Sequence, residues 1–77
     1  MKKYQYLTEE EYKYYKDLTE KLSNNLLNEL KLETIKGINE NEPPFKNEVQ
    51  KTTFYTFKEI NSIITNEIIY RTIITLK

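Results

Sequence analysis

Apolar residues recur every three or four positions through the first part of the chain, a spacing typical of an amphipathic helix. At about 100° per residue these positions fall within an arc of roughly 120°, and polar or charged residues occupy the opposite side. The apolar stripe consists of Tyr12, Tyr15, Leu18, Leu22, Leu26 and Leu30. The pattern therefore predicts a long helix whose apolar face belongs to the core.

Local signals mark where this helix should begin and end. Thr8 and Glu11 have the spacing of a capping box, in which each side chain accepts a hydrogen bond from the other residue's backbone. Gly37 is suited to cap the carboxyl end, so we expect one helix over residues 8–35. The polar run at 23–25 leaves an alternative open, in which two helices meet at a bend there.

The second half carries signals for strands. Residues 37–48 contain a Pro-Pro pair and predict a loop. Residues 49–57 are rich in Thr and aromatic side chains, and residues 67–76 are rich in β-branched ones, so both predict strands. Between them, 57–65 has helical spacing of its isoleucines and predicts a short helix, with a β-meander as the alternative.

These elements predict an α+β fold, with the long N-terminal amphipathic helix packed on a small β-sheet built from the C-terminal half. Residues 1–77 are expected to form a single small domain. The last predicted strand is apolar on both faces, and one helix covers only one of them. The short helix or a second copy of the chain would cover the other face, and we favour a homodimer.

Composition removes several classes of function. The chain has 12 Lys plus Arg against 12 Asp plus Glu, and it lacks both His and Cys. Without these two residue types it has neither the commonest general base nor a thiol nucleophile, and a structural zinc site is excluded. The single Gly rules out a glycine-rich phosphate loop. We therefore expect no enzyme, no cofactor and no metal.

Two further features concern location and origin. No apolar run approaches the roughly 20 residues of a membrane span, and the amino end lacks the apolar stretch of a signal peptide, which predicts a cytoplasmic protein. Ala is absent although it is the best helix former, while Lys, Asn, Ile and Tyr are abundant. This bias indicates an AT-rich genome, such as that of a low-GC bacterium or one of its viruses.

Tyrosine supplies the candidate binding residues. The chain has seven Tyr, of which Tyr4, Tyr6 and Tyr14 are required neither by the helix stripe nor by the strands. Exposed Tyr is enriched in interface hot spots, although Tyr that merely edges the core explains the pattern slightly better. Arg71 is a further candidate, because its planar fork suits paired recognition of a carboxylate or phosphate.

A neutral, catalytically bare chain of this size is typical of proteins that bind a larger protein stoichiometrically. We expect an inhibitor of a host or defence protein, of the kind phages and mobile elements encode, such as anti-CRISPR proteins; the analogy is one of size and composition only. The alternative is a small dimeric nucleic-acid-binding regulator. The lysines near the amino end, mixed with Tyr4 and Tyr6, would suit single-stranded nucleic acid; they are Lys2, Lys3, Lys13 and Lys16. The glutamates at 9–11 would repel phosphates.

Overall fold

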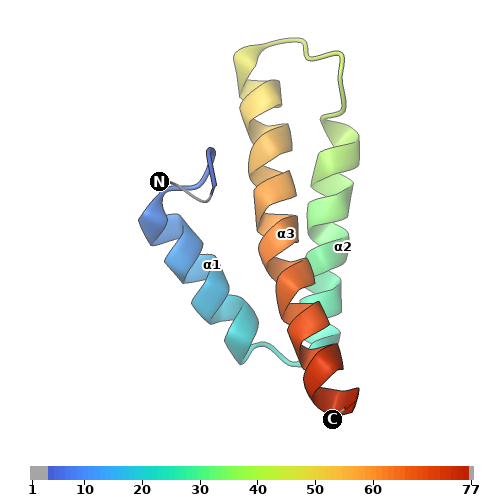
Figure 1. The fold of residues 1–77 in the computed structure, drawn as a ribbon. Coiled ribbons are helices and arrows are strands. Elements are labelled where there is room, and N and C mark those ends of the chain that lie inside the picture. Colours follow the sequence, from blue (N-terminus) through green and yellow to red (C-terminus); the bar gives the residue numbers. More distant parts are fainter. Residues whose placement is uncertain (1–3, 77) are drawn as a thin grey trace.

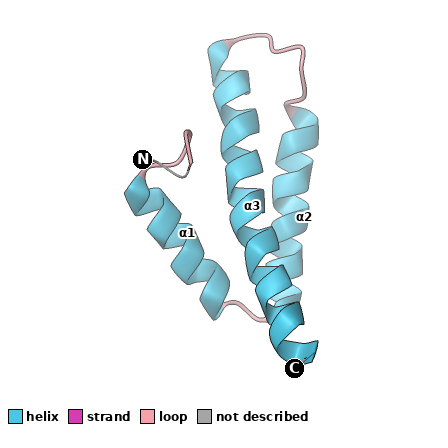
Figure 2. Cartoon of the chain, viewed as in Figure 1, coloured by secondary structure: helices cyan, strands magenta, loops and turns pink. Residues whose placement is uncertain are grey.

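The computed structural model describes residues 4–76, which fold into three helices and contain no strand (Figures 1 and 2). The helices are α1 (Glu9–Lys21), α2 (Asn24–Glu40) and α3 (Glu48–Leu76). α2 and α3 run side by side in opposite directions, while α1 lies obliquely against α3 (Figure 1). The predicted α+β fold is therefore wrong, because the described chain is entirely helical.

The first predicted helix is divided in two. The capping box is present: the Thr8 hydroxyl accepts from the Glu11 N–H at 3.1 Å, and the Thr8 N–H donates to the Glu11 carboxylate at 3.0 Å. The helix ends at Leu22, whose backbone is extended, and Ser23 caps α2 by accepting from the Leu26 N–H at 3.2 Å. A single helix over 8–35 is therefore wrong and the alternative bend at 23–25 is confirmed, because the Ser23 hydroxyl starts a new helix.

Gly37 does not end a helix. It is buried inside α2, which continues to Glu40, and no described glycine has a positive φ. A Cβ built at Gly37 would lie 2.6 Å from two ring carbons of Phe57 on α3. The residue therefore provides room for the Phe57 ring between two close helices, and the predicted C-terminal cap is wrong.

α3 replaces both predicted strands, at 49–57 and 67–76, as well as the short helix at 57–65 and the alternative β-meander. Asn47 caps it: the Asn47 side chain accepts from the Gln50 N–H at 2.8 Å. No Gly or Pro follows before residue 76, so nothing interrupts the helix. β-branched residues only slightly disfavour a helix, and packing against α1 and α2 outweighs that preference.

Threonine hydroxyls near the end of α3 fit the same conformation. The Thr72 hydroxyl donates to the Ile68 carbonyl at 2.9 Å, and the Thr75 hydroxyl donates to the Arg71 carbonyl at 2.8 Å. Each bond runs back one turn within the helix, which is the usual arrangement of Thr in a helix interior. Residues with high strand propensity are thus accommodated without unpaired hydroxyl groups.

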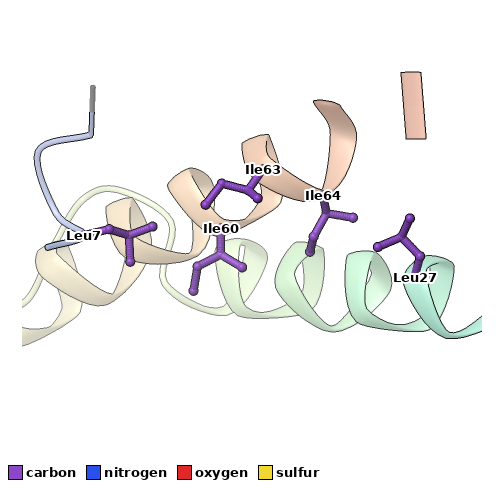
Figure 3. Close-up of a cluster of buried hydrophobic side chains, with 5 residues drawn as sticks. All are labelled: Leu7, Leu27, Ile60, Ile63 and Ile64. Carbon is purple, nitrogen blue, oxygen red and sulfur yellow. The ribbon is translucent and has the colours of Figure 1, made fainter. Parts of the chain in front are cut away.

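The core is small and centred on α3. It consists of Leu7, Leu27, Ile60, Ile63 and Ile64 (Figure 3). Leu22 and Leu30 of the predicted stripe only pack at its edge, whereas Leu27 is almost fully buried. The bend rotates α2 about its own axis relative to α1, which is why the core residue of α2 lies off the predicted stripe.

A buried polar pair crosses the α2–α3 interface. Thr34 is buried, and its hydroxyl accepts from the Asn61 side-chain amide at 2.8 Å while donating to the Lys31 carbonyl at 2.7 Å. Buried polar groups cost free energy unless they are bonded, so this pair fixes the register of the two helices.

Over residues 4–76, none of the helices is both long enough and apolar enough to cross a membrane.

Candidate protein-binding surfaces

The described surface carries more large apolar side chains than the interior. Six hydrophobic residues are buried, whereas ten large ones are exposed, so the small core does not account for the apolar content of the chain. The exposed residues are Tyr14, Leu26, Leu32, Ile35, Val49, Ile69, Tyr70, Ile73, Ile74 and Leu76. Clustering of such residues marks a docking surface more reliably than their presence singly.

The first cluster is a groove between α1 and α2. It has a volume of about 500 Å³ and is formed by leucines of both helices, with two glutamates. We call it the leucine groove; its residues are Leu18, Leu22, Leu26, Leu30, Leu32, Glu29 and Glu33. Leu26 is 50% exposed, and both glutamates are exposed, so an apolar surface lies open beside two negative charges.

The second cluster lies at the carboxyl end of α3. Ile69, Tyr70, Ile73, Ile74 and Leu76 are each at least half exposed. At about 100° per residue they spread over roughly 160° of the helix surface, because α1 and α2 cover only part of its circumference there. The exposed apolar side chains therefore lie on one half of the helix.

Tyr4 and Tyr6 are brought together beside α3, and Tyr4 also lines a groove with Tyr70 of the second cluster. Their rings line a shallow groove of about 570 Å³ between the amino-terminal segment and α3. The Tyr6 ring stacks on Tyr55 with 5.0 Å between centroids, and the Tyr4 ring lies 5.2 Å from that of Tyr12. Both candidate tyrosines are therefore half-buried and hold the segment against the helices.

Glu59 fastens the same segment by its backbone. Its carboxylate accepts hydrogen bonds from the N–H groups of Gln5 at 3.1 Å, Tyr6 at 2.9 Å and Leu7 at 3.0 Å. The sequence places Glu59 in a second capping-box pattern with Thr56, but both residues lie inside α3. Inside the helix the Glu59 carboxylate does not cap α3, so it bonds to the amino-terminal segment instead. A charged acceptor makes these hydrogen bonds stronger than neutral ones.

The remaining two candidates differ in their surroundings. Tyr14 is 62% exposed on α1, and its ring meets only the edge of Tyr15 among the ring contacts of the described residues. Arg71 uses its fork inside the chain: Nε binds the Glu67 carboxylate at 2.7 Å, and Nη2 donates to the Thr19 carbonyl at 2.8 Å. Nη1 also donates to the Asn24 side chain at 2.9 Å, so Arg71 fastens α3 to the corner between α1 and α2.

Other sequence-level candidates gain little from the geometry. Lys2 and Lys3 lie outside the described residues, while Lys13 and Lys16 are exposed on α1, the helix that begins with three glutamates. Within residues 4–76, no group of three or more acidic side chains is placed to hold a metal ion. Tyr4, Tyr6, Tyr14 and Arg71 do not converge on one surface.

No protein-family model, no curated protein and no solved structure matches the chain. Function is therefore inferred from the surfaces themselves. The leucine groove is the feature that sequence reasoning missed, because four of its leucines were assigned to the core stripe of one unbroken helix. The available signal was Ser23, a good N-cap residue in the middle of that stripe.

Proposed function

We propose that the chain is a non-catalytic domain that binds a larger protein by holding one of its amphipathic helices in the leucine groove. The observation that carries this proposal is the groove itself: leucines from two helices, open to solvent and bordered by two exposed carboxylates. Apolar side chains left exposed on the surface of a small protein gain free energy when a partner covers them.

The shape and charge of the groove favour a basic helix as the occupant. Grooves between helices receive amphipathic helices, whose apolar anchors recur at three- and four-residue intervals. Glu29 and Glu33 lie one helical turn apart on α2, so both carboxylates project along the same border. Lys or Arg next to the anchors would meet these charges, whereas Asp or Glu would be repelled.

Binding of this kind would make the chain a stoichiometric inhibitor, because the occupied helix of the partner is withheld from its own contacts. The lack of His and Cys supports a role without chemistry. The balanced charge supports a protein partner over a nucleic acid, since the chain has no excess of Lys and Arg to displace the counterions of the phosphates. We propose by analogy of size and composition only that the chain comes from a phage or mobile element and that its target is cytoplasmic.

Selection from a displayed peptide library tests the proposal without knowledge of the natural partner. The immobilised chain should enrich helical peptides with apolar anchors flanked by Lys or Arg, and anisotropy titrations would then give their affinities. Leu26→Ala and Glu33→Lys should each weaken binding at least about tenfold, which corresponds to about 1.4 kcal/mol. Leu26 is half exposed in the first turn of α2, where Ala is a good helix former, so folding should persist.

Glu48→Lys is the matched control for Glu33→Lys, because Glu48 is exposed on the first turn of α3 and does not line the leucine groove. Its binding should equal that of the wild type. Enriched peptides without the pattern, or full affinity of Leu26→Ala, would contradict the proposal. Single-stranded oligonucleotides in the same titration test the alternative, a dimeric nucleic-acid-binding regulator, whose affinity would fall steeply with salt.

A further inference from the structure

The outward side of α3 carries a second, independent docking surface. Asn66, Ile69, Ile73 and Leu76 follow one another at intervals of three, four and three residues, the spacing of a coiled-coil seam. We call these four residues the α3 seam. All of them are exposed, and none lines the leucine groove. A polar Asn among apolar seam residues is the arrangement that fixes register and oligomeric state when two like helices pair.

The charges around the α3 seam favour a second copy of the same helix. Residues 68–76 contain a single charged residue, Arg71, which is bound to Glu67 and to the corner between α1 and α2. The charged groups of this part of α3 are therefore engaged on its inner side. Two copies could approach seam to seam without bringing like charges together, which is the usual obstacle to pairing of identical surfaces.

The total accessible surface of the chain is larger than a monomer of this mass ordinarily exposes. The chain exposes 5960 Å², whereas a folded monomer of its mass of 9.4 kDa is expected to expose about 5,000 Å². The excess is about 1,000 Å², and one partner of a standard protein interface contributes about 800 Å². Closed two-fold dimers, in which the same patch meets itself, are the commonest protein assemblies.

We propose that the α3 seam is covered by the seam of a second copy of this chain running parallel to it, with the two-fold axis along the seam so that each seam residue meets its own copy. This dimer interface is separate from the leucine groove, so the two proposals stand or fall independently. It also accounts for the exposure of the last turns of α3: the side left open by α1 and α2 becomes the contact between the two copies.

Sedimentation velocity across a hundredfold concentration range tests the dimer, because mass action makes dimerisation concentration-dependent. The wild type should shift from monomer to dimer as concentration rises. Ile73→Glu should weaken dimerisation at least about tenfold, because it places a charge beside its own copy at the centre of the interface. Val49→Glu, at an exposed position on the first turn of the same helix, should dimerise like the wild type.

Ile73→Cys gives a readout that does not depend on how the glutamate variant folds. The chain has no other Cys, so a short bis-maleimide should link two copies through this position, whereas Val49→Cys should not be linked. A wild type that stays monomeric throughout would overturn the proposal. So would a dimer that Ile73→Glu leaves intact, or one that only variants of the leucine groove disrupt.

Discussion

Substituting Gly37 by Ala sets two opposing effects against each other. In an unhindered helix interior, Ala is more stable than Gly by about 0.5–1 kcal/mol, because Gly loses more backbone entropy on folding. At Gly37, however, the new Cβ would lie 2.6 Å from Cδ2 and Cε2 of Phe57 and 2.8 Å from its Cζ. Contacts this short force the ring or the helices to move, and such overpacking costs about 1–3 kcal/mol.

The steric effect should win, because Phe57 packs between α2 and α3 and its ring is partly buried. We expect Gly37→Ala to lower the free energy of unfolding by about 1 kcal/mol, which in a chain of this size lowers Tm by about 4–8 °C. Circular dichroism at 222 nm during a thermal melt measures this. Protein concentration must be held constant between variants, since association changes apparent stability.

A second background separates the two effects. Phe57→Val lacks the Cδ2, Cε2 and Cζ atoms that meet the added methyl group, so Gly37→Ala should be neutral or stabilising there. The double-mutant cycle should therefore show a coupling of at least about 1 kcal/mol between the two positions. If Gly37→Ala raised Tm equally in both backgrounds, the close approach of the helices at Gly37 would be refuted.

Two charged side chains give further predictions. Arg71→Lys keeps the charge but loses the planar fork, so it should lower the free energy of unfolding by about 1–3 kcal/mol. Lys36→Ala, at an exposed position on α2, should change it by less than about 0.5 kcal/mol. A denaturant titration compares them, and equal stability would refute the fastening role. Glu59→Gln should accelerate hydrogen exchange of the Tyr6 and Leu7 backbone N–H groups at least about tenfold, because the Gln side chain accepts fewer hydrogen bonds than the carboxylate. Unchanged exchange rates would refute the role of Glu59 in holding the amino-terminal segment.

Local signals in the sequence predicted the start of α1 correctly. The capping box at Thr8 needs only residues three apart, so it forms whatever the rest of the chain does. The bend at Ser23 is equally local, but the apolar stripe continues in phase across it and favoured an unbroken helix. Asn47 and Gln50 carried a similar signal for the start of α3, since Asn is a preferred N-cap residue.

Strand propensity misled the prediction for α3 because it describes a residue's preference on a half-buried sheet. Whether a run rich in Ile and Thr becomes a strand depends on the surface it packs against. Here Ile60, Ile63 and Ile64 pack at helical spacing with Leu7 of the amino-terminal segment and Leu27 of α2, and no sheet partner is present in the described chain. Helical spacing over 57–68 was visible in the sequence, but the flanking β-branched residues confined it to a short helix.

The candidate binding residues show the limit of sequence reasoning about surfaces. Tyr14 was selected because it lies off the stripe, and the structure places it in solvent. Tyr4 and Tyr6 were selected by the same logic and Arg71 for its planar fork. Yet the Tyr6 ring stacks on Tyr55 of α3, and Arg71 bonds to Asn24 and Thr19, which lie 47 and 52 positions away in the sequence. Such long-range contacts carry no local signal. Whether any of these residues contacts a partner stays a prediction.

The two charged clamps explain how a chain with a small core keeps its apolar surfaces open. Glu59 holds the amino-terminal segment against one part of α3, and Arg71 holds the corner between α1 and α2 against another. These bonds hold α1 on α3 and leave the leucine groove open to solvent. Because the α3 seam lies on a different helix from that groove, a dimer formed through the seam would present two grooves at once. A partner with two suitable helices would then bind with an avidity that exceeds the affinity of a single groove.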